Sequence, residues 1–479
     1  MGAIDRIASA LPADKRYNLR VDLPPGPRMP ALLQAAFVTA SPYGWMVKRW
    51  QRYGDIFSSR FPIFGRVVYV AEPSLVKEVF AGDPATFHAG EANTLALGDA
   101  LGDHSLLTLD EDRHLSQRKL LLPPFHGESV RRYVEVMAEA TEREVSGWPV
   151  GKPFALRPRM QAITLEVILR AVFGVRDGER MDLFRERIPP LGETTSVLNW
   201  IPLFDRDLGG ITPAAKFRRA LAAVDELIYA EIADRRAADD ERDDVLSLLL
   251  RARHEDGSAM TDTELRDELL TLLTAGHETT ATGLSWAFER LLRTPRVLER
   301  LTGSLDDDEY VDAVVKETLR VRPVVVDVAR KLTRDTEVAG WRLPAGTLVL
   351  PAIAVLHKRP DLYESPDEFR PERFIQGGAE SYAWIPFGGG VRRCIGASFA
   401  QVEMRTVLRE VLRRVRLRAP DARPERGVVR HVTVVPGRGC RAVVEERLAV
   451  EPAAELARAE NGRARVADAA RQVAVRGHD

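Results

Sequence analysis

One stretch near the C-terminal end reads Phe387-Gly388-Gly389-Gly390-Val391-Arg392-Arg393-Cys394-Ile395-Gly396, and it indicates both the fold and the site. Three successive glycines permit left-handed backbone and the close approach of another group. Cys394 stands where the amphipathic pattern of a helix begins, so free N–H groups and the positive end of the helix dipole stabilise a thiolate there. Beside the cationic Arg392, such a thiolate suits an iron that carries a flat anionic ring. This predicts haem, with Cys394 as its axial ligand.

The stretch resembles the haem-binding signature of the cytochrome P450 family, and Phe387, Gly390, Arg392, Cys394 and Gly396 match its fixed positions. The resemblance covers residues 24–446. It implies the P450 fold, which is mainly α with a small β portion and forms a single globular unit with a helix-rich and a β-rich subdomain. Residues 1–23 are predicted to be an N-terminal extension. Residues 447–479 are predicted to be a tail rich in Ala, Arg and Glu, either helical or disordered.

The composition is that of a globular protein whose net charge is close to zero. The 479 residues are 45% hydrophobic and 29% charged, which is ample material for a large core. The 69 basic and 70 acidic residues leave a net charge of -1, so nothing indicates nucleic acid or an anionic membrane as a partner of the whole chain. Only two cysteines occur, Cys394 and Cys440, which excludes a disulfide framework and favours a reducing compartment. Residues 1–22 hold no apolar run of signal-peptide or membrane length, so we expect a cytoplasmic protein without stable membrane insertion.

Local patterns predict where the β portion lies. Residues 56–61 and 66–70 read as two strands joined by a turn, and helical patterns dominate after residue 73. Residues 87–106 read as a long loop, which is unusual in a compact domain unless it is functional; by resemblance it covers the substrate pocket. Near the end of the chain, residues 431–436 and 441–445 are predicted to pair as a hairpin that turns at Gly437-Arg438-Gly439.

A long central helix is predicted between two clear end signals. Thr261 and Glu264 have the spacing of a capping box, and Thr294-Pro295 ends the helical pattern. A helix of some thirty residues is roughly 45 Å long, enough to cross a whole domain.

In the middle of this helix lies Ala275-Gly276-His277-Glu278-Thr279-Thr280. Gly276, followed by hydroxyls that can bond backbone carbonyls, favours a local opening of the helix. A carboxylate beside a hydroxyl in an apolar helix can deliver protons into a dry pocket. The same sequence would also be expected for a helix with a surface Glu and a Thr bonded back to its own backbone. The stretch resembles the oxygen-activation motif of the family. The resemblance implies that Thr279 hydrogen-bonds with activated oxygen and that Glu278 belongs to the proton path, which makes both catalytic.

Further residues are predicted to bind the cofactor. His114 and Arg118 are four apart on a predicted helix and share a face that suits a carboxylate. In the family such a pair binds a haem propionate, and Arg330 falls at another propionate-binding position. The predicted cofactor is haem b, iron protoporphyrin IX, with Cys394 as the metal ligand. The other predicted cofactor-binding residues are Phe387, Gly388, Gly390, Arg392, Gly396, His114, Arg118, Arg330 and Ala275.

Two further sets follow from the resemblance. Glu317 and Arg320 are three apart on a predicted helix. With Arg373 they match a buried ionic triad of the family that supports the cysteine loop. Charges of this kind can be buried when they are paired. The predicted substrate pocket is lined by Leu95, Leu272, Gly276, Val324 and Val325.

The prediction is therefore a haem-thiolate monooxygenase that inserts one oxygen atom of O2 into an apolar substrate, such as a fatty acid, a terpenoid or a steroid. The chain carries no flavin or nicotinamide fingerprint and no cysteine set for an iron–sulfur cluster, so electrons are expected from a ferredoxin or similar donor and its NAD(P)H reductase. The expected basic docking face comprises Arg113, Lys119, Arg131, Arg132, Arg393 and Arg405. Two alternatives remain open: a peroxide-using or rearranging haem-thiolate enzyme, and a non-catalytic haem sensor.

Overall fold

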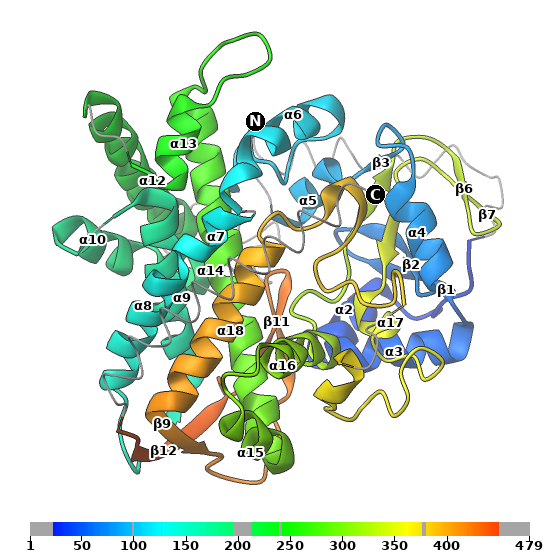
Figure 1. The fold of residues 1–479 in the computed structure, drawn as a ribbon. Helices are drawn as coiled ribbons and strands as arrows, with labels where there is room; N and C mark the ends of the chain where they lie inside the picture. The colour runs from blue at the N-terminus through cyan, green and yellow to red at the C-terminus, as the bar shows by residue number, and fades with distance from the viewer. Residues whose placement is uncertain are drawn as a thin grey trace, which may run out of the picture.

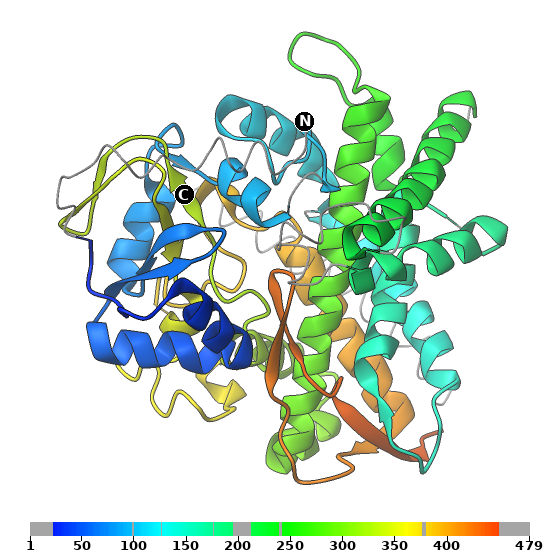
Figure 2. The same ribbon diagram turned by 180° about the vertical axis from the view of Figure 1, so that it is seen from behind.

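The computed structural model of the chain describes residues 23–97, 100–125, 127–175, 177–194, 212–238, 242–375 and 380–449. Residues 1–22 and 450–479 lie outside the described residues, and with them most of the predicted extension and tail. Figure 1 shows a helix-rich part on the left and a part that contains most of the strands on the right, with the long helix α14 (Asp262–Arg293) between them. Figure 2 gives the same arrangement from behind. The two parts match the predicted helix-rich and β-rich subdomains of one globular unit.

The elements follow in chain order. The other helices are α2 (Ala31–Ala40), α3 (Pro42–Tyr53), α4 (Pro73–Ala81), α5 (Gly90–Leu97), α6 (Glu111–Leu121), α7 (Glu128–Arg132), α8 (Val134–Ser146), α9 (Leu156–Phe173), α10 (Glu179–Arg187), α11 (Pro189–Thr194), α12 (Pro213–Ala237), α13 (Val245–Arg251), α15 (Pro295–Gly303), α16 (Asp308–Val321), α17 (Ile353–Leu356) and α18 (Ala397–Arg414). The strands are β1 (Ile56–Phe61), β2 (Gly65–Val70), β3 (Phe87–His88), β4 (Phe154–Ala155), β5 (Arg330–Leu332), β6 (Thr336–Val338), β7 (Trp341–Leu343), β8 (Leu348–Pro351), β9 (Val415–Arg418), β10 (Gly427–Arg430), β11 (Thr433–Pro436) and β12 (Arg441–Arg447).

The predicted central helix is confirmed, including both of its ends. The Thr261 hydroxyl accepts from the Glu264 N–H at 3.2 Å, and the Glu264 carboxylate accepts from the Thr261 N–H at 2.8 Å, which completes the capping box. α14 packs against α9, α16 and α18, and together these helices hold the largest apolar core. Contrary to the predicted opening at Gly276, the helix is continuous through that residue. Its hydrogen-bond ladder is kept because the hydroxyls there back-bond without breaking it.

The main sheet has five strands in the order β1-β2-β8-β5-β3. β1 and β2 form the predicted antiparallel hairpin, and β2 pairs with β8 in parallel. Side chains alternate along β2: Val67 and Tyr69 join the core that contains α3, while Val68 and Val70 join the core that contains α4. Both faces of the sheet are therefore covered.

Two predicted features differ in the structure. The segment 87–106 is not a plain loop, because it contains β3 and the helix α5. The predicted C-terminal hairpin is wrong: β11 pairs with β10, whereas β12 pairs with β9 and β4. The turn at residues 437–439 leads from one sheet to another, since Gly439 approaches Ala155 and Arg157 rather than closing a two-stranded ribbon.

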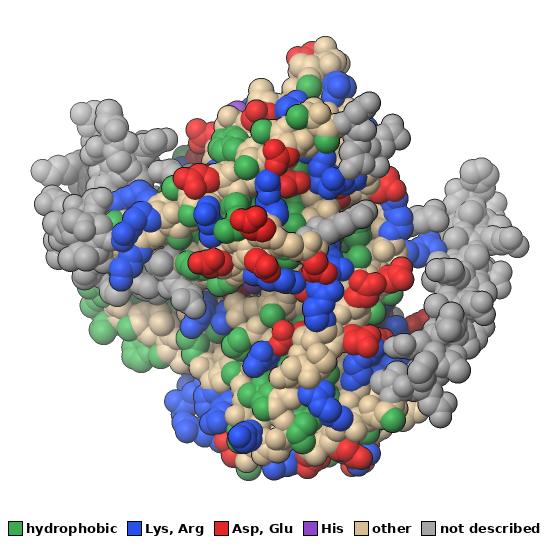
Figure 3. Space-filling model, turned by 90° about the vertical axis from the view of Figure 1, so that its left-hand side faces the viewer, with side chains coloured by type: hydrophobic (Ala, Val, Ile, Leu, Met, Phe, Trp, Pro, Cys, Tyr) green, Lys and Arg blue, Asp and Glu red, His purple; other side chains and the backbone are tan. Residues whose placement is uncertain are grey.

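Acidic and basic side chains alternate over the surface. Figure 3 shows this mixture on the side where α10 and α12 lie, and pairs such as Arg180 with Asp234 (2.6 Å) account for part of it. No helix in the described ranges combines the length and the hydropathy needed to cross a bilayer.

Candidate haem-thiolate site

The glycines of the cysteine loop are required by backbone conformation and by close packing. Gly388 and Gly390 have φ values of 68° and 63°, in the left-handed region. A Cβ on Gly389 would lie 2.4 Å from the ring of Phe80, and one on Gly390 would lie 2.3 Å from the Phe80 carbonyl oxygen. The loop therefore lies directly on the end of α4. It closes when the Cys394 N–H donates to the Phe387 carbonyl at 2.9 Å.

Cys394 lies just before α18, which begins at Ala397. Its side chain is accessible to solvent, yet the surrounding protein desolvates the sulfur and raises the pKa of the thiol. A hydrogen bond from the Gly396 N–H and the charges of Arg118 and Arg393 act in the opposite direction. The predicted N–H donor is thus present, but the cations that act on this sulfur are Arg118 and Arg393 rather than Arg392.

Arg392 belongs to a separate cationic cluster with His114, Arg118 and Arg330. Its guanidinium donates to the Leu106 carbonyl at 3.2 Å and to the Asp110 carboxylate at 2.5 Å. His114 is buried, and burial together with the three arginines lowers its pKa to about 3, so the ring is neutral. Burial and the nearby Arg392 lower the pKa of Arg330 to about 10.

This cluster has more cations than anions. Among the described residues, Asp110 is the only carboxylate that pairs with any of the three arginines, and Arg118 forms no ion pair. The cluster holds three guanidinium groups, one carboxylate and a neutral imidazole donor. Its net positive charge would be neutralised by two further carboxylates. The structure therefore brings together the predicted His114, Arg118, Arg330 and Arg392 in an arrangement that suits the two propionates of haem.

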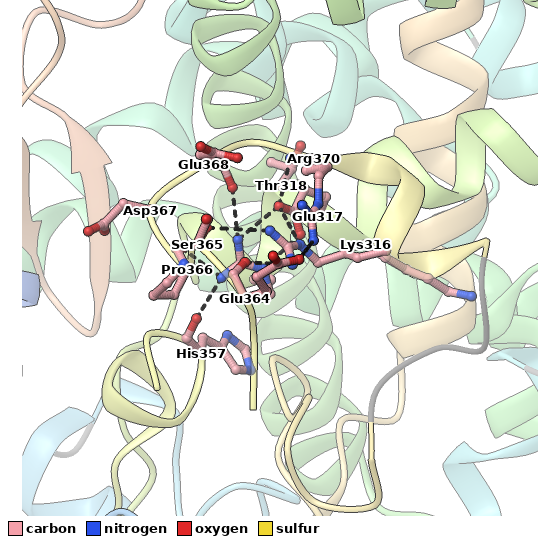
Figure 4. Close-up of polar contacts among 12 residues, drawn as sticks. Lys316, Glu317, Thr318, His357, Glu364, Ser365, Pro366, Asp367, Glu368 and Arg370 are labelled. Carbon is pink, nitrogen blue, oxygen red and sulfur yellow. Dashed lines mark hydrogen bonds and ion pairs between the residues drawn. The ribbon is translucent and has the colours of Figure 1, made fainter. Parts of the chain in front are cut away.

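The predicted ion pairs of Glu317, Arg320 and Arg373 are present; Glu317 and Arg320 are fully buried, and Arg373 is partly buried. Glu317 accepts from the Arg320 side chain at 2.7 and 2.8 Å and from Arg373 Nε at 3.1 Å. Figure 4 shows the carbonyl groups that converge on these charges, and Arg320 donates to those of His357, Pro366 and Glu368 at 2.7 to 3.0 Å. Every charge in the triad is thus hydrogen-bonded, which is the condition under which buried ion pairs are tolerated.

His357 connects this triad to the cysteine loop. Its carbonyl accepts from Arg320, and its ring Nε2 accepts from the Ile385 N–H at 3.1 Å. Burial lowers the pKa of His357 to about 3, which keeps the ring neutral and able to accept that bond. Ile385 in turn accepts from the Gly388 N–H at 3.0 Å, so an unbroken chain of bonds runs from Glu317 to the loop.

On the central helix, the acid and the alcohol are held in different ways. The Thr279 hydroxyl donates to the Ala275 carbonyl at 2.6 Å. The Glu278 carboxylate accepts from Arg157 at 2.9 Å and from the Gln161 amide at 2.5 Å, both on α9. Glu278 is therefore not a free surface acid but one side of a partly buried ion pair between two helices.

The predicted pocket residues lie around these elements. Leu272 and Val324 are buried, Leu95 is half-buried against the core under α3, and Val325 is half-buried. The Val324 carbonyl accepts from the Val434 N–H at 2.8 Å, which ties the extended segment after α16 to β11. A Cβ on Gly276 would lie 2.9 Å from the Ile168 Cδ1, so glycine allows α14 to pack closely against α9 there. The contact of these five residues with substrate stays a prediction.

Several supporting residues were not predicted. Asp110 pairs with Arg392, Phe80 packs on the glycines, His357 bonds the loop, and Arg157 and Gln161 hold Glu278. Arg157 and Gln161 are four apart on α9, which places them on one face, but nothing in their own pattern names Glu278 as their partner.

Comparison with known proteins gives the family. The family model for cytochrome P450 matches residues 23–436. The chain is 47% identical to the protein named cytochrome P450 135B1 of Mycobacterium bovis, over 88% of this chain and 90% of that protein. It is 42% identical to cytochrome P450 138 of Mycobacterium tuberculosis, over 89% and 97% of the two chains. Among solved structures, retinoic acid-bound cyanobacterial CYP120A1 matches with a TM-score of 0.78 at 27% identity, covering 89% of this chain and 99% of that one.

The fold, the loop that carries Cys394 and the cluster of His114, Arg118, Arg330 and Arg392 thus fit a haem-thiolate protein. The contacts of these residues with haem stay a prediction. The chain belongs to the cytochrome P450 family. As a member of that family it is a monooxygenase, an oxidoreductase that uses haem, O2 and electrons from a redox partner.

Proposed function

We propose that this monooxygenase uses haem b to insert one oxygen atom of O2 into an apolar substrate of the fatty acid, terpenoid or steroid type, in the cytoplasm. The observation that carries the proposal is the acid–alcohol pair Glu278–Thr279 on a continuous α14. When bound, the haem supplies the oxygen-activating chemistry. The task of the chain is then to hold the sulfur ligand, to exclude water and to move protons.

Cys394 would ligate the iron as the thiolate and donate electron density to it. The Gly396 N–H and the charge of Arg118 favour that anionic form against the cost of burial. Arg118, Arg330, Arg392 and the neutral His114 would bind the propionates, which would relieve the excess positive charge of the cluster.

The proton path would start at Glu278. Its carboxylate is half-buried and bonded to Arg157 and Gln161, so it stays oriented until that contact loosens. The Thr279 hydroxyl donates to Ala275 and keeps its oxygen lone pairs free to accept a hydrogen bond. To relay a proton, it would accept one on a lone pair and release its own hydrogen, which would have to turn away from the Ala275 carbonyl.

An apolar substrate is supported by the character of the predicted pocket, since Leu95, Leu272, Val324 and Val325 are all aliphatic. One similar solved structure is described as retinoic acid-bound, which is consistent with that class.

A ferredoxin or similar donor with its NAD(P)H reductase would supply the electrons. Of the predicted docking cations, Arg113 and Arg393 are exposed, while Lys119, Arg132 and Arg405 are paired with Glu255, Asp243 and Asp312. An acidic partner would have to compete with those three pairs, so we expect Arg113 and Arg393 to dominate docking.

The decisive test is Thr279→Ala with redox partners and a substrate identified by a spectral binding screen. We expect similar substrate binding but much less product per electron pair consumed. Thr274→Ala is the matched control, because Thr274 makes the same kind of back-bond, to Leu270 at 2.8 Å, five residues earlier on the same helix. Unchanged coupling in Thr279→Ala would favour the peroxide-using alternative. A ferrous carbonyl complex without the red-shifted absorption of sulfur ligation would contradict the role of Cys394.

A further inference from the structure

The helix α2 exposes large apolar side chains and buries a polar one. Leu32, Leu33 and Phe37 are 73%, 51% and 50% exposed, whereas the polar Gln34 is 1% exposed. The Gln34 amide donates to the Met29 carbonyl at 2.9 Å and its oxygen accepts from the Arg60 N–H at 3.2 Å. The helix is thus held in place by its glutamine and presents its large apolar side chains to the outside.

The β10–β11 hairpin extends this apolar surface. Val428 and Val432 are 40% and 43% exposed, and both α2 and α3 contact β10. Figure 2 shows the dark blue α2 and α3 on the same side as the orange hairpin. Among the large apolar side chains of the described residues, five of the nine most exposed belong to these two neighbouring elements, and clustering of this kind marks an interaction site.

The rim of this surface is basic. Between Leu23 and Ala71 the sequence has six Lys or Arg residues and one acid, and that acid, Asp55, is bonded to Arg359 and Trp50. Residues 426–438 add three arginines and no acid; of these, Arg438 is paired with Asp421 at 3.0 Å, which leaves Arg426 and Arg430. The near-zero charge of the whole chain therefore conceals a strongly basic region.

These basic side chains are available to a partner. Arg28, Arg60, Arg66 and Arg430 are exposed, and none of the four forms an ion pair within the described parts of the chain. Arg60 and Arg66 lie directly opposite each other in the β1–β2 register. Like charges at opposite positions destabilise a hairpin unless an anion lies nearby.

We propose that the α2 surface, made of Leu32, Leu33, Phe37, Val428 and Val432, binds the headgroup region of an anionic lipid bilayer. An exposed apolar helix face with a rim in which basic side chains far outnumber acidic ones has the composition of a peripheral membrane contact. A second copy of the chain fits less well, because a two-fold interface would place the arginines against one another. The contact needs no spanning helix.

Vesicle co-sedimentation of the full, haem-loaded chain tests this proposal. The probes are vesicles of phosphatidylcholine alone and of phosphatidylcholine mixed equally with phosphatidylglycerol. We expect binding to the anionic vesicles that weakens with salt, and at least about tenfold weaker binding for L32S/F37S and for R28Q/R60Q. The control V134S/Y229S changes side chains of 37% and 40% exposure on α8 and α12 and should bind as the wild type does.

All substituted side chains are exposed, so the haem spectrum and the melting temperature should be unchanged. Failure of the wild type to sediment with anionic vesicles would overturn the proposal, as would equal sedimentation of wild type and L32S/F37S. Sedimentation velocity adds a further outcome: a wild-type dimer that L32S/F37S dissociates would assign the surface to self-association instead of lipid.

Discussion

Glu268 on α14 gives the sharpest prediction of stability. It is fully buried, and neither carboxyl oxygen has a hydrogen-bond partner in the described structure. Burial raises its pKa from 4.5 to about 8, although the Gln117 amide and the Leu106 N–H lie near enough to oppose that shift. The unfolded chain releases the Glu268 proton near pH 4.5, whereas the folded protein keeps it up to about pH 8.

The sign of the effect follows from this difference in bound protons. Below pH 4.5 both states are protonated, so Glu268 costs nothing in ionisation; above that pH the folded state loses about 1.4 kcal/mol per pH unit until about pH 8, where the loss levels off. At pH 7 the loss amounts to roughly 3 kcal/mol. Glu268→Gln keeps the shape without an ionisable proton, so we expect it to be more stable than wild type by an amount that grows with pH.

The measurement is urea unfolding by circular dichroism at half-unit steps of pH, on haem-loaded protein. The control is Glu299→Gln, an exposed glutamate without an ion pair in the described residues, which should follow the wild type. Parallel stability curves for Glu268→Gln and wild type across this range of pH would refute the reasoning, because they would mean that Glu268 is ionised in the folded protein.

Three further predictions concern the scaffold and the proton path. Glu317→Ala leaves one buried and one partly buried guanidinium group unpaired and should cost about 3 to 5 kcal/mol of unfolding free energy, while Glu364→Gln, on an exposed side chain, should leave the urea midpoint unchanged. Gly390→Ala places a Cβ 2.3 Å from a backbone oxygen at a φ of 63° and should abolish haem incorporation, measured as haem per polypeptide; Gly303→Ala, which meets nothing within 4 Å, should not. Arg157→Gln removes one of the two bonds to the carboxylate of the acid–alcohol pair. It should alter the pH profile of product formed per electron pair without changing substrate affinity, and an unchanged profile would contradict a role for that ion pair in proton delivery.

Sequence reasoning predicted those features that depend on local chemistry. The capping box located α14, the β1–β2 turn located the first hairpin, and the glycine-rich stretch located the cysteine loop. It failed where the partner of a segment is remote. β12 has strand periodicity, but that periodicity does not state that β9 and β4 are its neighbours.

The same limit applied to the site. Arg392 was expected beside Cys394 because the two are close in sequence, yet a salt bridge to Asp110 turns the guanidinium toward His114. The partners of Glu278 lie more than a hundred residues earlier, on α9, and a single sequence gives no signal for such a contact.

The predicted ligand Cys394 and the predicted catalytic acid Glu278 are supported by separate sets of residues. The loop that carries Cys394 rests on Phe80 of α4 and, through His357, on the ion pairs of α16. Glu278, by contrast, forms an ion pair with Arg157 of α9. Substitutions in α9 that move Glu278 can therefore accumulate without displacing the sulfur of Cys394. This division of supports offers a physical reason why one oxidative chemistry could be retained while the compounds it acts on diversify.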